Sequence, residues 1–317
     1  MMPKLTLYIN SVSFESIPME KPIQSVGVIG KYHKRGVQKT LSSLIAFLKK
    51  NNIRTVVEEE TAAMLGPNTC KQVKRENLGS ACELVIVVGG DGSLLNAAHA
   101  VVDHNTPVLG INRGRLGFLT DISPADLEHK LTKILAGEYY EEKRFLLDAD
   151  IRFENEGLSS QSALNEIALL PGPIPHIIEF EIYIDDQFMC NERSDGLIIA
   201  TPTGSTAYAL SGGGPIVHPE LNAIVIVPMF PHSLHSRPIV IDAEHDINIV
   251  ILEDNDTIPR ISCDSRGYTD ITPGSLIHIR KKQEHLRIIH PLDYDYYDAL
   301  RSKLHWGKKN YHDADED

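Results

Sequence analysis

The chain has 317 residues, enough for one large domain or two ordinary ones, and a net charge of −12 at pH 7. This acidic balance argues against a nucleic-acid-binding protein, which usually carries a basic face, but it leaves open a local pocket for an anionic ligand. The apolar runs, such as Leu84–Val88, are too short to span a membrane, and the first residues do not resemble a signal peptide. Four scattered cysteines form no CxxC pair. We therefore expect a cytoplasmic protein with no membrane partner.

The N-terminal half alternates short apolar strands with amphipathic helices. Ser25–Gly30 (SVGVIG) predicts a buried strand, and residues 36–52 have the apolar spacing of a helix. A second candidate strand lies at residues 55–59, the clearest strand begins near Leu84, and Pro107–Asn112 predicts another. Strands that alternate with helices predict a parallel, doubly wound sheet, which binds its ligands at the carboxyl ends of the strands.

The pattern changes near Phe145 to short runs rich in Ile and Val, separated by Gly, Pro, Asn and Asp. We predict an α/β plus all-β fold, with an N-terminal Rossmann-like doubly wound α/β domain and a C-terminal, mostly antiparallel β-sandwich-like domain. The predicted division is an N-terminal extension (1–24), the α/β domain (25–143), the β-rich domain (144–292), a helix at about 293–309 that packs back on the α/β domain, and an acidic tail (310–317).

The motif GGDGS, Gly89–Ser93, lies between the clearest strand and the helix that follows it. Backbone N–H groups and the helix dipole favour phosphate at this position, and glycines allow close approach. Asp91 is unusual there, because a carboxylate repels phosphates unless it accepts a proton or holds Mg²⁺ during phosphoryl transfer. An ordinary Gly-Asp-Gly turn is the alternative. The chain lacks both GxxxxGK[ST] and GxGxxG, which disfavours a P-loop NTPase and an ordinary Rossmann dehydrogenase.

Polar residues also interrupt the apolar runs of the C-terminal half. Asn165 and Glu166 lie within a predicted strand, where they need partners unless the strand is an edge strand that faces water. Asp195 is either a ligand residue or a turn residue. The stretch Asp195–Pro215 (DGLIIATPTGSTAYALSGGGP) combines many hydroxyl groups with glycines, which suits a ligand recognised through many small directional contacts.

With these segments taken together, the chain closely resembles the NAD kinase family from about Ser25 to Lys309. Members of that family have counterparts, in the same order, of GGDGS, NRGRLGFLTD, NE, RSDGLIIATPTGSTAYALSGGGPIVHP and PMFPHSLHSRP. The resemblance implies transfer of a phosphate from ATP, or from polyphosphate, to the 2′-hydroxyl of the adenosine ribose of NAD, which gives NADP. It also implies a divalent metal ion, expected to be Mg²⁺, bound with the ATP phosphates. Family members usually assemble as homodimers or homotetramers.

The resemblance also implies roles for individual residues. Asp91 is the expected proton acceptor, and Gly89, Gly90, Gly92 and Ser93 are expected at the ATP phosphates. Arg266 stands where we expect glutamine in close relatives, so it either makes no ligand contact or makes a different one. The NAD-binding set is expected to comprise Asp91, Gly92, Asn165, Glu166, His176, Arg193, Asp195, Thr203, Thr206, Ala207, Tyr208, Ala209, Leu210, Ser211 and Arg266.

We expect no metal site built from protein side chains. His218, His232 and His235 lie in or near PMFPHSLHSRP, but three prolines and the lack of a nearby cysteine or carboxylate make this poor zinc chemistry. We interpret that segment as a packed loop.

Two other functions stay open at this point. One is a non-catalytic NAD(P)-binding sensor, which the intact Asp91 disfavours. The other is a lipid or sugar kinase that shares GGDG, for which the TPTGSTAY segment would have no use.

Overall fold

The computed structural model describes residues 22–31, 36–66, 70–113, 117–153, 157–173 and 176–306. The acidic tail, nearly all of the predicted N-terminal extension, and Gly114–Leu116 of the NRGRLGFLTD motif lie outside these ranges. Within the described residues, every helix is too short or too polar to cross a bilayer.

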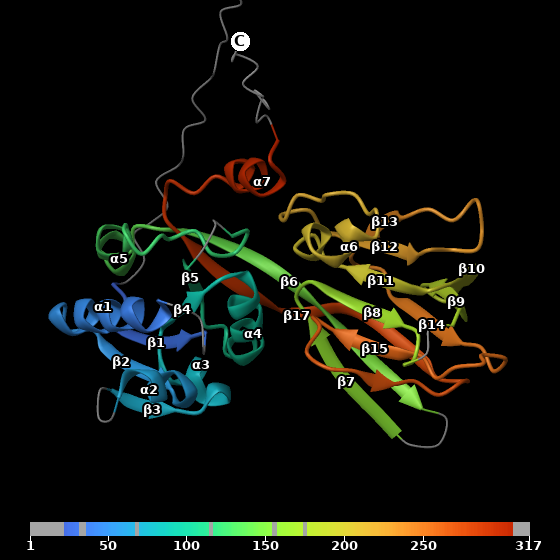
Figure 1. Cartoon of the computed structure of the whole chain (residues 1–317), viewed down its shortest axis with the longest axis horizontal. Coiled ribbons are helices and arrows are strands. Elements are labelled where there is room, and N and C mark those ends of the chain that lie inside the picture. The colour runs from blue at the N-terminus through green and yellow to red at the C-terminus, as the bar shows by residue number, and fades with distance from the viewer. Residues whose placement is uncertain are drawn as a thin grey trace, which may run out of the picture.

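The N-terminal half is a parallel sheet with helices on both faces (Figure 1). Its strands follow the order β3-β2-β1-β4-β5, the order expected for a doubly wound fold. Leu84, Ile86 and Val88 pack with α1 and α5, whereas Val85 and Val87 pack with α3 and α4, because successive side chains of a strand point to opposite faces. The elements are β1 (Ser25–Gly30), α1 (Val37–Lys50), β2 (Arg54–Glu58), α2 (Glu59–Leu65), β3 (Lys71–Val73), η1 (Arg75–Asn77), α3 (Leu78–Ala81), β4 (Leu84–Gly89), α4 (Asp91–Val101), η2 (Val102–His104), β5 (Val108–Asn112) and α5 (Leu127–Leu135).

The C-terminal half is an antiparallel β-sandwich. One of its two layers, in the order β13-β12-β11-β8-β15-β16, is a separate sheet, and the other continues the N-terminal sheet through β17, β14, β9 and β10. Phe180 and Ile249 of one layer share an apolar core with Ile167 and Ile199 of the other. The predicted fold class is therefore confirmed. The strands are β8 (Glu166–Leu170), β9 (Ile178–Ile184), β10 (Gln187–Ser194), β11 (Gly196–Ala200), β12 (Ala223–Met229), β13 (Ile239–Asp242), β14 (Ile247–Ile251), β15 (Arg260–Cys263) and β16 (Thr269–Asp270).

Two long strands, β6 (Tyr140–Phe153) and β17 (Leu276–His290), run through both halves (Figure 1). They pair with each other along most of their length, with a register shift between Lys281 and His285. The N-terminal end of β17 pairs with β14, and its C-terminal end pairs with β5. The division predicted between residues 143 and 144 falls inside β6, and the domain limits stay a prediction. The remaining elements are β7 (Gly157–Ala163), η3 (Gly204–Thr206), α6 (Tyr208–Ser211) and α7 (Tyr296–Leu304).

Candidate functional site

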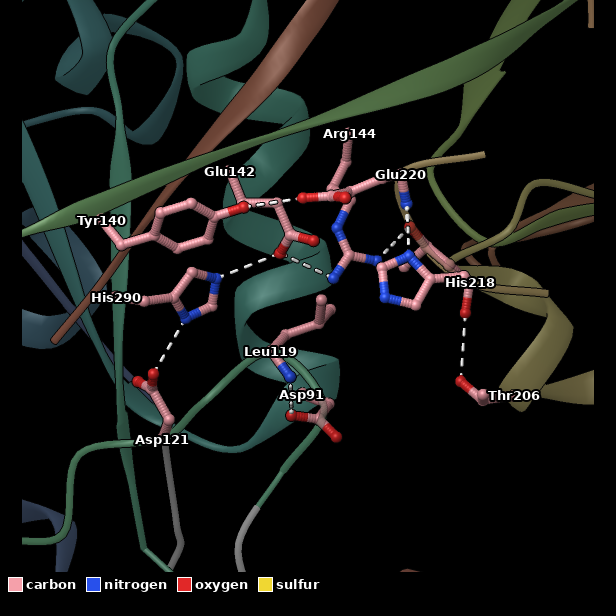
Figure 2. Close-up of polar contacts among 11 residues, drawn as sticks. Asp91, Leu119, Asp121, Tyr140, Glu142, Arg144, Thr206, His218, Glu220 and His290 are labelled. Carbon is pink, nitrogen blue, oxygen red and sulfur yellow. Dashed lines mark hydrogen bonds and ion pairs between the residues drawn. The ribbon is translucent and has the colours of Figure 1, made fainter. Parts of the chain in front are cut away.

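Asp91 is the first residue of α4, directly beyond the carboxyl end of β4. Its carboxylate accepts hydrogen bonds from the backbone N–H groups of Phe118 and Leu119, at 3.0 and 3.1 Å, and from the Thr120 hydroxyl at 3.1 Å. Figure 2 shows the contact with Leu119. Gly117 must be glycine, because a Cβ atom there would lie 2.0 Å from Asp91 Oδ1. The side chain is 31% exposed. Asp91 is therefore fixed in orientation and still accessible to a ligand.

The glycines around Asp91 shape a place for an anion. The first N–H groups of a helix have no carbonyl partner within it, so the start of α4 attracts phosphate. A Cβ atom on Gly92 would meet nothing within 4 Å, which leaves the backbone there accessible, whereas one on Gly89 would lie 2.3 Å from Ser93 Oγ. Ser93 Oγ is buried and has no hydrogen-bond partner. The motif thus combines an exposed backbone with an unused hydroxyl.

Lys303 of α7 brings a positive charge to the same place. We expected this C-terminal helix to pack on the α/β domain, but the contact with Asp91 was not predicted. Its Nζ lies 3.8 Å from Asp91 Oδ2 and 6.0 Å from the centroid of the Phe118 ring. An ammonium group here offsets the repulsion between the Asp91 carboxylate and a phosphate.

The Asn165–Glu166 segment and the hydroxyl-rich loop that follows β11 together form a second wall of the candidate site, and the first wall is the segment around Asp91. Its strand, β8, lies between β11 and β15, so the alternative of an edge strand that faces water is wrong. The Asn165 carbonyl accepts a hydrogen bond from Thr201 N at 2.9 Å. A Cβ atom on Gly204 would lie 2.0 Å from the same carbonyl oxygen, so only glycine lets the loop pack this closely.

Part of the hydroxyl content of this loop serves the loop itself. Thr201 donates to the Leu164 carbonyl, Ser205 to the Pro202 carbonyl and Thr206 to the Thr203 carbonyl. Ala209 is fully buried and therefore offers no exposed surface to a ligand. The exposed members of the predicted set here are Tyr208 and Ser211, while Thr206, Ala207 and Leu210 are half-buried.

Glu166 is a buried carboxyl group with an unusual environment. It is 5% exposed, and its Oε2 has no hydrogen-bond partner. Burial and, to a smaller extent, the nearby charge of Asp264 raise the pKa of Glu166, while a hydrogen bond from Tyr208 N lowers it, and together they bring the pKa to about 7. Glu166 therefore exchanges its proton near neutral pH and keeps an unused acceptor for a ligand.

This shift makes the stability of the protein depend on pH through Glu166. An unfolded chain loses this proton near the ordinary value of 4.5, so between pH 4.5 and about 7 the folded protein binds more protons and its stability falls as the pH rises. The shift corresponds to a loss on the order of 3 kcal/mol at about 1.4 kcal/mol per pH unit. Glu166→Gln is expected to remove this loss, as measured by urea unfolding at about pH 5 and about pH 8.

The matched control for this measurement is Glu253→Gln, because Glu253 is exposed. It is expected to keep the pH dependence of the wild-type protein. An equal stability difference between Glu166→Gln and wild type at both pH values would contradict the assignment.

Asp264 organises this wall, although it was not among the predicted site residues. Its buried carboxylate accepts hydrogen bonds from the backbone N–H groups of Leu164, Asn165 and Glu166, at 2.7, 2.8 and 3.2 Å. It also lies 2.7 Å from Nε2 of His99 on α4. Asp264 therefore connects the helix that begins at Asp91 with the Asn165–Glu166 segment.

Four further predicted residues lie on other elements. Arg193 is exposed at the end of β10, and Asp195 is exposed just before β11, a five-residue strand about 16 Å long whose other end leads into the hydroxyl-rich loop. Asp195 and Thr203 of the same chain therefore do not lie close together. His176 is exposed in the connection between β8 and β9, and Arg266 donates to the Ser162 carbonyl at 2.9 Å.

The loop after β12 differs from the prediction of a packed segment. Phe230 is 76% exposed and Leu234 is 86% exposed, so that interpretation was wrong. The loop lies beside Arg193 and Asp195, because His232 N donates to the Arg193 carbonyl and Asp195 N to the Met229 carbonyl. Across the described ranges, no cluster of three or more His, Cys, Asp or Glu residues is arranged to hold a metal ion.

Comparison with known proteins gives consistent matches over most of the chain. The ATP-NAD kinase N-terminal domain matches residues 26–139, and the ATP-NAD kinase C-terminal domain matches residues 164–291. The NAD kinases of Pseudomonas entomophila and Ectopseudomonas mendocina are 50% and 49% identical over 286 residues, which is 90% of this chain and 97% of each relative.

Comparison with solved structures agrees with these matches. Yeast NADH kinase complexed with NADH has a TM-score of 0.83 at 24% identity, covering 92% of this chain and 90% of that chain, and so supports the fold. An NAD kinase from Archaeoglobus fulgidus in complex with ATP has a TM-score of 0.67 at 25% identity, covering 89% and 98%. These matches remove the lipid and sugar kinase alternative. The chain belongs to the ATP-NAD kinase family, and its reaction is the phosphorylation of NAD by ATP.

Proposed function

We propose that Asp91 accepts the proton of the adenosine 2′-hydroxyl while that oxygen attacks the γ-phosphorus of ATP. The observation that carries this proposal is the fixed yet accessible Asp91 carboxylate at the start of α4. A ribose hydroxyl is a poor nucleophile at neutral pH and gains from a positioned base. The new P–O bond forms as the bond from the γ-phosphorus to the bridging oxygen of ADP breaks, and ADP leaves.

The ATP phosphates are proposed to bind at the start of α4, on the backbone of Gly89, Gly90 and Gly92, with the Ser93 hydroxyl as a further donor. The described residues offer no cluster of metal ligands beside them. Such a donor set fits Mg²⁺ that binds mainly through phosphate oxygens and water. The ion would neutralise the charge of the transferring phosphate.

The wall opposite Asp91 is proposed to hold NAD. Asn165 and the unused Oε2 of Glu166 offer acceptors and donors for ribose or base groups. Thr203 and the segment Thr206–Ser211 present backbone and short side chains, which suits a dinucleotide bound through many small contacts.

A second copy of the chain is proposed to complete this site, as a homodimer or homotetramer. Arg193 and Asp195 lie about a strand length from the Thr203 loop of their own chain. The exposed Phe230 and Leu234 beside them form an apolar surface suited to contact with another subunit. In a symmetric assembly this contact would carry Asp195 to the partner's loop. A cytoplasmic location stays a prediction, in keeping with the free thiols of the four cysteines.

Mixing two inactive variants tests the shared site. Asp91→Asn and Asp195→Asn oligomers are each expected to form little NADP. When their subunits are co-expressed, mixed assemblies contain sites with neither substitution, so activity is expected to return to about a quarter of the wild-type level. NADP is measured with an NADP-specific dehydrogenase after incubation with NAD, ATP and Mg²⁺.

The outcomes separate the two arrangements. If Asp91 and Asp195 of one chain served the same site, every site in the mixture would carry one substitution, and activity would stay at background. An active Asp195→Asn oligomer would remove Asp195 from the site altogether.

A further inference from the structure

A chain of buried polar side chains runs between the two halves of the protein (Figure 2). His290, the last residue of β17, lies 2.8 Å through Nδ1 from Asp121 Oδ2 and 3.2 Å through Nε2 from Glu142 Oε2. Arg144 donates through Nη2 to the same Glu142 oxygen at 2.7 Å and through Nη1 to the Thr203 hydroxyl at 3.1 Å. We call these five residues, Asp121, Glu142, Arg144, Thr203 and His290, the interdomain chain.

The two ends of the interdomain chain lie at the two walls of the site. Asp121 directly follows Phe118–Thr120, the segment whose N–H and hydroxyl groups hold Asp91. Thr203 begins the loop toward Ser211, and its carbonyl accepts the Thr206 hydroxyl at 3.2 Å. In Figure 2, Asp91 and Thr206 lie on the same side of the Glu142–Arg144 pair. The interdomain chain therefore connects the segment that orients Asp91 with the loop proposed to hold NAD.

The middle of the interdomain chain is charged and almost fully buried. His290 is 0% exposed, and Glu142 and Arg144 are each 4% exposed. Burial by itself would lower the pKa of His290, but hydrogen bonds to Asp121 and Glu142 and their charges raise it overall. Two carboxylates thus alternate with His290, whose charged form they favour, and a guanidinium, and the Tyr294 ring stacks on His290 with centroids 3.9 Å apart. Buried charges are costly unless they are paired, and within this set only Asp121 Oδ1 and Arg144 Nε are buried without a hydrogen-bond partner.

We propose that Glu142, Arg144 and His290 are positioning residues for phosphoryl transfer, which set the Thr203–Ser211 loop relative to Asp91. The inference rests on the proposed roles of Asp91 and that loop. The hydrogen bonds of these three side chains join them to one another, to Thr203 and to Asp121, so their effect acts through Thr203 and Asp121. Because a misplacement of about 1 Å can lower a rate about 10²-fold, loss of the interdomain chain reduces kcat more than NAD binding.

Arg144→Lys tests this inference directly. Lysine keeps a positive charge beside Glu142, but one ammonium group does not reproduce the fork that reaches both Glu142 and Thr203. We expect kcat to fall about 10- to 100-fold, with the KM for NAD changed less than about threefold. The matched control is Arg287→Lys, which alters the ion pair of Arg287 with Glu141 on the same two strands. It is expected to keep kcat within about twofold of wild type.

A second pair of variants keeps the buried charges intact. Thr203→Val removes the hydroxyl that accepts from Arg144, and Thr203→Ser retains it. We expect Thr203→Val to lower kcat and Thr203→Ser to restore it, and we expect the losses from Thr203→Val and Arg144→Lys to be less than additive when combined.

The measurements are kcat, KM and melting temperature of each full-length variant in the NADP assay. A wild-type kcat in Arg144→Lys or in Thr203→Val overturns the inference, whatever the melting temperature. An equal loss of kcat in Arg287→Lys, or strict additivity in the double variant, also overturns it. Failure of the proposed role of Asp91 is seen separately, as turnover in Asp91→Asn.

Discussion

Replacement of Asp91 by asparagine is expected to lower kcat for NADP formation by about 10²- to 10⁴-fold while NAD still binds. An amide is nearly the same size as the carboxylate, and its single oxygen can still accept two of the three hydrogen bonds from the segment Phe118–Thr120, but it does not take a proton at neutral pH. The measurement combines the coupled NADP assay with calorimetric binding of NAD. Turnover lost with binding retained would show that Asp91 serves the chemical step rather than the binding of NAD.

The matched control is Asp103→Asn, at the other end of the same helical segment. Asp103 is exposed and pairs with Lys282. This variant is expected to keep kcat within about twofold of wild type, as for other surface ion pairs. If Asp91→Asn kept kcat within tenfold of wild type, Asp91 would not be the base.

Replacement of Asp264 by alanine is expected to lower the free energy of unfolding by about 3–5 kcal/mol. The change leaves the N–H groups of Leu164, Asn165 and Glu166 without the carboxylate that they share, and it removes the contact with His99. Urea unfolding measures this loss. The charge of Asp264 also contributes to the raised pKa of Glu166, so the pKa of Glu166 is expected to decrease in the same variant.

Asp270→Ala serves as the comparison, because Asp270 is more than half exposed and pairs with Arg260. It is expected to cost less than about 1 kcal/mol. A similar small cost for Asp264→Ala would show that the backbone of the Asn165–Glu166 segment keeps its position without this carboxylate.

The sequence was most informative where local pattern and chemistry agree. The strand before GGDGS, the helix after it and the change to short Ile- and Val-rich runs near Phe145 predict the two layered halves, because periodicity follows directly from which side chains are buried. GGDGS also predicts where phosphate binds, since glycine, strand end and helix start meet within Gly89–Ser93, and that site stays a prediction.

Contacts between distant segments were beyond this kind of prediction. Asp264 and Lys303 reach the site through turns and helix packing that leave no local trace. Glu142 and Arg144 did carry a signal, because charges two apart in a strand share one face, yet nothing in the sequence says that this face is buried against His290. The exposed Phe230 and Leu234 were expected inside a packed loop, because an apolar side chain alone does not tell a core from a subunit contact.

The β6–β17 pair also limits how the two halves move around their substrates. Enzymes with two domains often close by rotation about a few linker dihedrals. Here the halves are joined by a hydrogen-bonded ribbon of two strands, so rotation must bend the ribbon itself. The register shift between Lys281 and His285 is the place where bending disturbs the pairing least. We therefore expect the halves to behave as one mechanical unit, with local loop movements rather than a domain hinge admitting NAD and ATP.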